Sequence, residues 1–225
     1  MNCRGVLAIT MALVYCGCAS NYDPPISTYH EPETLELSGV IRYRTLTRDD
    51  FQSTTPPNEG KGIPRHASAA LVGAVRVSPQ SDWLVTQMKT GSDSTWFEAR
   101  ARNLRFEAIM DPRTSWWNEE LDSASTAYVL EHEQIHFAIF ELEARRLNVR
   151  IPEIAARLRS IAPTIDEARR AADARLEEER RAWDRKLEER QNQFERETAN
   201  GKLRDRQLEW WSRIRSELAA TAWSH

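Results

Sequence analysis

The chain has 225 residues, of which 29% are charged and 40% hydrophobic, and its formal net charge is −3. This length suffices for one domain with a sizeable core and an appendage. The charge is nearly balanced and no long basic run stands apart from mixed-sign segments, which excludes the pattern typical of nucleic-acid-binding proteins. We therefore expect no nucleic-acid partner.

The N-terminus has the pattern of an export signal. Arg4 precedes an apolar run that is too short to span a bilayer as a helix, and small residues follow. We interpret residues 1–17 as a lipoprotein-type signal peptide, Cys18 as the lipidated first mature residue, and residues 18–33 as a polar tether. This predicts an exported envelope protein, an outer-membrane lipoprotein that faces the periplasm and touches the membrane only through its lipid. A soluble periplasmic or secreted protein is the alternative.

Cysteine usage limits the chemistry that the rest of the chain can support. All three cysteines, Cys3, Cys16 and Cys18, lie in this leader region. The remaining sequence therefore has neither a disulfide framework nor a thiolate metal site. Any metal ion must be held by histidine or carboxylate side chains.

Strand patterns dominate the first half of the remaining chain. Residues 34–112 contain several short segments rich in β-branched and aromatic residues, separated by turn signals. The segment 104–110 alternates cleanly between apolar and charged residues. These patterns predict a small, mostly antiparallel sheet, followed by a helix that Ser123 or Ser125 caps, within one unit spanning residues 34–150. The fold class is therefore α+β.

The second part, residues 151–225, is predicted to be helical. Thr164 and Glu167 form a capping box that starts a long helix over about residues 165–200. This helix lacks a sustained heptad repeat, so we expect it to pack back on the core. The alternative is that it projects and binds an envelope protein partner. Its apolar residues form one stripe: Ile165, Ala172, Leu176, Trp183, Leu187 and Phe194.

The segment 132–136 reads His-Glu-Gln-Ile-His, which is the pattern H-E-x-x-H. On a helix, His132 and His136 are one turn apart and both imidazoles can reach one zinc ion. Glu133 lies about 100° around the helix from His132, where it can serve as a general base without being a ligand. This spacing is typical of zinc metallopeptidases, which activate water to hydrolyse peptide bonds.

The surroundings of this motif favour a metal site. Apolar residues flank it on all sides, so the helix is expected to be buried nearly all round. Two histidines and a glutamate are costly to bury without partners or a function. A pair of hydrogen-bonded core histidines is the structural alternative.

The segment around the motif resembles a bacterial family described as secreted zinc-dependent proteases, whose biology is otherwise unassigned. Similar segments span most of residues 40–215, including "LTRDDF", "HASAAL", "FEAIMDPRTSWW" and "FERETANGKLRDRQLEWW". The resemblance implies a zincin-like fold with a zinc cofactor and a peptide or protein substrate. The residues that match the family's central motif are His132, Glu133, Gln134, His136, Phe137, Ile139, Glu141, Ala144 and Arg145.

The third zinc ligand is where this chain departs from the family. Asn200 stands where the family has a histidine before glycine, and asparagine is a weak neutral oxygen ligand. We expect Glu197, one turn earlier, to be the third ligand, with Asn200 as an alternative. Glu141 points away from the pair. Glu153 or Glu167 would serve in an arrangement where a following helix provides the ligand.

These observations predict a zinc-dependent metallopeptidase of the bacterial cell envelope, with Glu133 as general base. The rival prediction is a catalytically degenerate lipoprotein of the same fold that acts in partner binding. Asn200 is the sequence feature that separates the two, because a lost third ligand would weaken or abolish zinc binding. A third possibility is a structural zinc domain without turnover.

Overall fold

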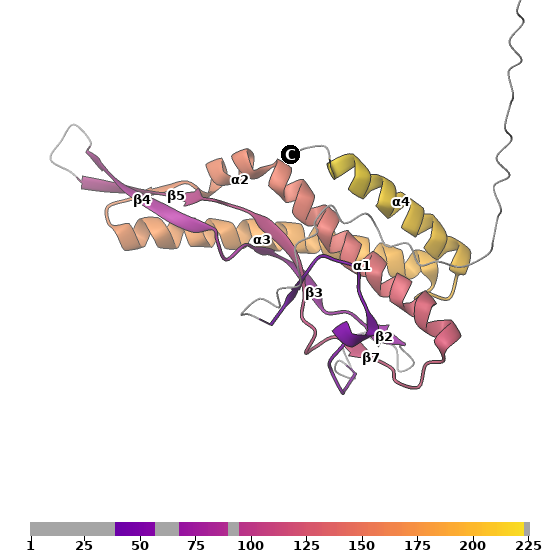
Figure 1. The fold of residues 1–225 in the computed structure, drawn as a ribbon. Coiled ribbons are helices and arrows are strands. Elements are labelled where there is room, and N and C mark those ends of the chain that lie inside the picture. The colour runs from indigo at the N-terminus through magenta and orange to yellow at the C-terminus, as the bar shows by residue number, and fades with distance from the viewer. Residues whose placement is uncertain (1–38, 57–67, 90–94, 223–225) are drawn as a thin grey trace, which may run out of the picture.

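The computed structural model describes residues 39–56, 68–89 and 95–222. It confirms the α+β class, since small antiparallel sheets in the N-terminal half precede long helices (Figure 1). The predicted leader, the tether and Cys18 lie outside the described residues. Within the described ranges, no helix is both long enough and apolar enough to cross a membrane.

The first sheet has the strand order β1-β6-β3, and all its pairs are antiparallel. It consists of β1 (Ile41–Arg42), β3 (Gly73–Val77) and β6 (Phe106–Met110). The alternation that predicted β6 is seen in its burial, because Phe106, Ala108 and Met110 are at most 2% exposed. This face of the sheet packs against the first long helix, α1 (Ser123–Val149).

Two smaller β elements complete the region beside this sheet. The strands β2 (Ala69–Ala70) and β7 (Trp116–Trp117) pair antiparallel with each other. A short 3₁₀ helix, η1, spans Arg48–Asp50. Both β2 and β3 contact α1, and the backbone of Leu71 between them is hydrogen-bonded to Glu133 of α1.

The second sheet has the order β4-β5-β8, and it combines distant parts of the chain. It consists of β4 (Asp82–Lys89), β5 (Thr95–Arg102) and β8 (Ser160–Ala162). No element was predicted for β5, and residues 160–162 were predicted to be helical, which is wrong because they pair with β5 as a strand. The three-residue β8 has no periodicity of its own and exists through its pairing with β5, in which Phe97 lies opposite Ala162.

Four helices follow: α1 (Ser123–Val149), α2 (Ile151–Leu158), α3 (Ile165–Thr198) and α4 (Arg204–Ala222). The predicted serine cap of α1 is wrong. Asp122 is the N-cap, and its carboxylate accepts a hydrogen bond of 2.6 Å from the backbone N–H of Ser125. A carboxylate at this position also interacts favourably with the positive end of the helix dipole.

The helix α1 lies at the centre of the fold. It contacts β3 and β6 on one side and α3 and α4 on the other. Its residues Ile135, Phe137, Ala138 and Ile139 are all 0% exposed, so the helix is buried nearly all round, as predicted. The H-E-x-x-H segment is therefore held by packing from both the sheet and the helical layer.

The helix α3 links the second sheet to the other long helices. It runs along β5 and β8 and then lies against α1 and α4 (Figure 1). Most of the predicted apolar stripe is buried, but Ile165 is 50% exposed because it is the first residue of the helix and burial begins one turn later at Ala168. The backbone N–H of Glu167 donates to the Thr164 hydroxyl, which confirms Thr164 as the predicted N-cap. The Glu167 carboxylate accepts a hydrogen bond of 2.9 Å from the same hydroxyl.

Candidate metal centre

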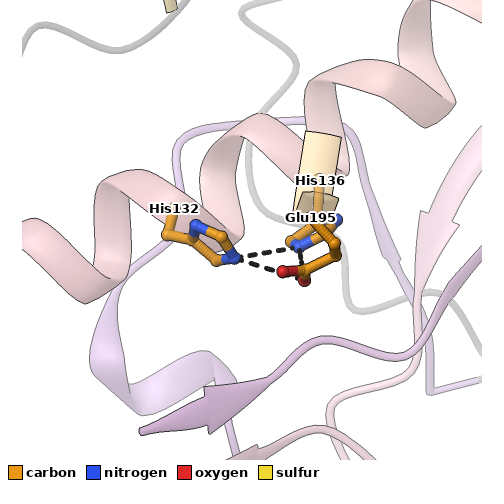
Figure 2. A group of neighbouring side chains, drawn as sticks. All are labelled: His132, His136 and Glu195. Carbon is orange, nitrogen blue, oxygen red and sulfur yellow. Dashed lines mark hydrogen bonds and ion pairs between the residues drawn. The ribbon is translucent and has the colours of Figure 1, made fainter. Parts of the chain in front are cut away.

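The two histidines of the motif point the same way from α1. The Nε2 atoms of His132 and His136 lie 3.1 Å apart (Figure 2). Their side chains are 12% and 15% exposed, so both rings are largely withdrawn from solvent. The one-turn spacing predicted from the sequence thus brings both ring nitrogens to a common point.

A carboxylate from α3 completes this group. The Oε1 atom of Glu195 lies 2.8 Å from the Nε2 atom of His136 and 3.4 Å from that of His132. Ligand atoms of the three residues all lie within 4.8 Å of one another, so the group could hold a metal ion. The second carboxylate oxygen of Glu195, Oε2, is buried and has no hydrogen-bond partner among the described residues.

Packing of one aromatic residue explains why Glu195 reaches the histidines. Phe194 is 0% exposed, and its ring centroid lies 4.7 Å from that of His132 and 4.8 Å from that of His136. Trp210 of α4 contacts the same phenyl ring, with 5.3 Å between the centroids. This packing fixes the rotation of α3 and directs the next side chain, Glu195, toward the pair.

The third member of the group is therefore Glu195 and not Glu197, which the sequence analysis had chosen. The two positions are about 200° apart around a helix, so they face opposite sides of α3. Glu197 accepts hydrogen bonds from Gln193 Nε2 at 2.7 Å and from Trp210 Nε1 at 2.8 Å. Asn200 is exposed, and its backbone adopts a left-handed conformation with φ 54° just after α3 ends.

The other carboxylates considered from the sequence also have different partners. Glu141 binds the Arg145 guanidinium at 2.7 Å, Glu153 binds Arg150 at 3.2 Å, and Glu167 belongs to the cap of α3. The overlooked signal for Glu195 was its place beside Phe194 in the apolar stripe. A carboxylate on the buried face of a helix needs a partner.

Glu133 is held beside the group by the first sheet region. Its side chain is 5% exposed, and its Oε2 atom accepts a hydrogen bond of 3.0 Å from the backbone N–H of Leu71, directly after β2. Its negative charge acts on His136. The structure therefore places the predicted general base next to the histidines with its orientation fixed by the backbone.

Each histidine has a glutamine at its other ring nitrogen. The Nδ1 atom of His132 lies 3.1 Å from Oε1 of Gln207 on α4, and the Nδ1 atom of His136 lies 2.6 Å from Oε1 of Gln191 on α3. Gln207 is 0% exposed. The sequence analysis did not find these contacts, because no local pattern relates Gln191 or Gln207 to α1.

The loop between α3 and α4 covers one side of His132. Tyr128 donates its hydroxyl proton to the carbonyl oxygen of Gly201, with 2.5 Å between the oxygens. Gly201 has φ +74°, and a Cβ atom there would lie 3.1 Å from Nδ1 of His132. Glycine is thus needed at this position both for the backbone conformation and for the close approach to the ring.

The Glu195 carboxyl and the His136 imidazole shift each other's pKa values. Burial disfavours the charged form of Glu195, but hydrogen bonds and charges from His132 and His136 lower the pKa of its carboxyl far below the usual range. Burial lowers the pKa of His136, yet the Glu195 hydrogen bond and the charges of Glu133 and Glu195 outweigh this and raise it above its ordinary value. A positive charge is therefore favoured between the imidazoles and the carboxylate.

No known protein family, curated protein or solved structure matches this chain. The resemblance to secreted zinc-dependent proteases accordingly stays a prediction from the sequence. The geometry of His132, His136, Glu195 and Glu133 carries the functional argument instead.

Proposed function

We propose that this chain is a zinc-dependent peptidase of the bacterial cell envelope. The observation that carries the proposal is the meeting of three ligand atoms from His132, His136 and Glu195. Their separations of 2.8, 3.1 and 3.4 Å surround the value of about 3.3 Å expected between ligands of a tetrahedral zinc ion with bonds of about 2.0–2.1 Å.

The residues present fit a zinc ion by their chemistry as well as by their spacing. Imidazole nitrogen suits zinc, and two histidines with one carboxylate form a set that leaves a fourth position for water or substrate. The buried Oε2 atom of Glu195, which has no hydrogen-bond partner within the described part of the chain, is a further acceptor that a cation would satisfy. A bound zinc ion would polarise a substrate carbonyl and make a water molecule more acidic.

The role proposed for Glu133 follows from its position on α1. Its carboxylate accepts the proton of the attacking water and returns it to the nitrogen of the leaving amine. The hydrogen bond from Leu71 N–H to Oε2 keeps the carboxylate in one orientation during this transfer. His132, His136 and Glu195 hold the ion, and they take no part in moving the proton.

The proposed location and substrate rest on the N-terminal sequence and on the chemistry of the site. The signal pattern in residues 1–17 with Cys18 supports an exported lipoprotein, for which envelope proteins or peptides are the available substrates. A soluble exported form is the alternative outcome if Cys18 carries no lipid. Mass spectrometry of the mature N-terminus distinguishes the two forms.

A degenerate, partner-binding protein was the rival prediction because Asn200 stands where a third ligand was expected. With the Glu195 carboxylate 2.8 Å from His136, a third ligand no longer depends on position 200. We therefore favour the enzyme.

The first test is the zinc content of the purified chain by elemental analysis, beside the His132→Ala/His136→Ala double variant. We expect about one zinc ion per chain in the wild type and none in the variant. Proteolysis is then followed with fluorescently labelled casein. Glu133→Gln should keep the zinc ion and lose hydrolysis by at least about 100-fold, the lower range for removal of a general base.

Glu143→Gln is the matched control, because Glu143 lies on the same helix and contacts only the Arg146 guanidinium, at 3.7 Å, among the described ion pairs. It should retain both zinc and activity. Absence of zinc from the wild type after reconstitution would refute the proposal. A zinc-loaded wild type without hydrolysis of any peptide library would support a structural metal domain instead.

A further inference from the structure

We infer that Gln191 and Gln207 are positioning residues that fix the tautomers of the two motif histidines, with the proton on Nδ1 of both rings. The inference rests on the proposed metal site, because it assigns the Nε2 lone pairs of His132 and His136 to the ion. The two glutamines come from different helices, α3 and α4, and each contacts one imidazole.

The orientation of the Gln191 amide follows from a partner that can only accept. Gln191 Nε2 donates to the backbone carbonyl oxygen of His136 at 3.1 Å. Its Oε1 atom must therefore be the one that faces the ring, at 2.6 Å from Nδ1 of the same histidine. Since a carbonyl oxygen accepts, Nδ1 of His136 is the donor and carries the proton.

The orientation of the Gln207 amide is fixed in the same way by different partners. Its Nε2 atom donates to the backbone carbonyl oxygen of Tyr128 and to the carboxylate of Glu131, each at 3.2 Å. The carbonyl oxygen of Tyr128 can only accept, so the Nε2 atom faces it and the Oε1 atom faces His132. Nδ1 of His132 is then the donor across 3.1 Å.

The consequence concerns the other side of both rings. With the protons on Nδ1, the two Nε2 atoms present lone pairs to each other at 3.1 Å and to the Glu195 carboxylate. Three lone pairs that meet without an intervening proton repel one another unless a cation lies between them. The glutamines thus prepare the ligand nitrogens for a metal ion before it arrives.

The glutamines also set the charge around the site. Metal-ligating histidines often donate to a carboxylate, which raises the basicity of the ligand. Amide oxygens fix the tautomer equally well without adding a negative charge. Glu195 is therefore the single anionic member of the group that would hold the ion, with Glu133 beside it.

The test measures zinc affinity of the full chain by competition with a chelator. Gln191→Met removes the acceptor with little change in volume, and we expect it to raise the Kd about 10–100-fold, as is usual for residues that orient a metal ligand. Gln191→Glu keeps an acceptor for Nδ1 and should bind zinc at least tenfold more tightly than Gln191→Met. Gln193→Met is the matched control, because Gln193 lies on the same helix and binds Glu197 instead.

A second readout reports the tautomers directly. Two-bond ¹H–¹⁵N correlation spectra of the zinc-loaded chain should show Nδ1–H on both motif histidines. Gln191→Met should remove the hydrogen-bonded signal of His136 and leave that of His132. Gln207→Met should remove the hydrogen-bonded signal of His132 and leave that of His136. Either variant alone therefore tests the inference if the other fails to fold.

The outcomes separate this inference from the proposed function. A wild type that binds no zinc overturns both. A wild type that binds zinc, together with Met variants that match the Gln193→Met control in affinity, overturns only the role of the glutamines. Signals from Nε2–H in the zinc-loaded wild type would likewise contradict the assigned tautomers.

Discussion

The helix α3 has two halves that bury different kinds of residue. In the outer half, residues 165–182, the buried residues are Ala168 and Ala172, which pack with Ala99 and Ala162 of the second sheet. In the inner half, residues 183–198, large side chains such as Phe194 enter the main core, and Glu195 joins the histidines there. The outer half of α3 thus packs on the second sheet, whereas the inner half contributes a side chain to the candidate metal centre.

The difference shows what anchors a functional carboxylate. The outer half is surrounded by exposed ion pairs such as Arg180 with Glu177, which water and salt screen. The inner half places Glu195 between two imidazoles and behind the ring of Phe194, where a charge needs a partner. Charged residues occur in both halves of α3, but most of those in the outer half are exposed, whereas Glu195 of the inner half lies between two imidazoles that are largely withdrawn from solvent.

The largest expected effect is on zinc binding, and it should distinguish Glu195 from Glu197 near the end of the inner half. Glu195→Gln should abolish stoichiometric zinc binding, with a loss greater than the roughly 10–100-fold typical of residues that only orient a ligand. Glu197→Gln should bind zinc like the wild type, because Glu197 contacts Gln193 and Trp210 instead. Isothermal titration calorimetry measures both, and the reverse ranking would restore the ligand predicted from sequence.

The next effect concerns the ring that orients Glu195. Phe194→Ala should lower the free energy of unfolding by about 3–5 kcal/mol, because the ring is 0% exposed and leaves a cavity between both imidazoles and Trp210. In the outer half, Leu176→Ala should cost less, since Leu176 is only partly buried. Urea unfolding of both variants gives the comparison, and equal losses would contradict the distinction between the halves.

Protons should compete with zinc for the histidines that the inner half of α3 contacts. Zinc needs the neutral imidazole, and the pKa of His136 lies above its ordinary value because of Glu195. The Kd for zinc should therefore rise as the pH falls, beginning above about pH 6.5 and approaching tenfold per pH unit for one displaced proton. Titrations between about pH 8 and about pH 5.5 measure this, and a constant Kd would refute it.

A smaller effect is expected at the turn that ends the inner half. Gly201→Ala strains a backbone with φ +74° by roughly 1–2 kcal/mol and brings a methyl group to 3.1 Å from Nδ1 of His132. Gly39→Ala is the control, since Gly39 has φ +70° but its nearest neighbour is the mobile end of Arg113, at 3.5 Å. Both variants should lose stability, but only Gly201→Ala should also weaken zinc binding.

The smallest effect is expected from the exposed charges of the outer half. Arg180→Ala removes ion pairs with Glu177 and Asp184, and it should leave the Tm and zinc content unchanged within error. Differential scanning calorimetry provides the measurement. A clear drop in Tm would mean that the outer half contributes through its charges and not only through Ala168 and Ala172.

Local patterns were sufficient to predict the α+β class and the pairing of His132 with His136. The alternation in β6 and the capping residue Thr164 are each decided within a few neighbouring residues. The one-turn spacing of the two histidines is likewise a property of any helix.

Features that depend on distant segments were missed. The strand β8 exists through its pairing with β5, and the choice of Glu195 over Glu197 depends on how Phe194 rotates α3 against α1. Gln191 and Gln207 contact the histidines of α1 from α3 and α4. The periodicity of each helix in the sequence does not show how these helices pack on one another. Each of these features depends on tertiary packing, so residue spacing along the chain could not predict it.

The separation of the ligands along the chain has a consequence for the order of events during synthesis. His136 and Glu195 are 59 positions apart, and they meet only when α3 has docked on α1. A nascent or partly folded chain offers the histidine pair alone, without the carboxylate. The proposed hydrolytic activity would therefore begin only after α3 has docked on α1, and an incompletely folded chain would not cleave other proteins.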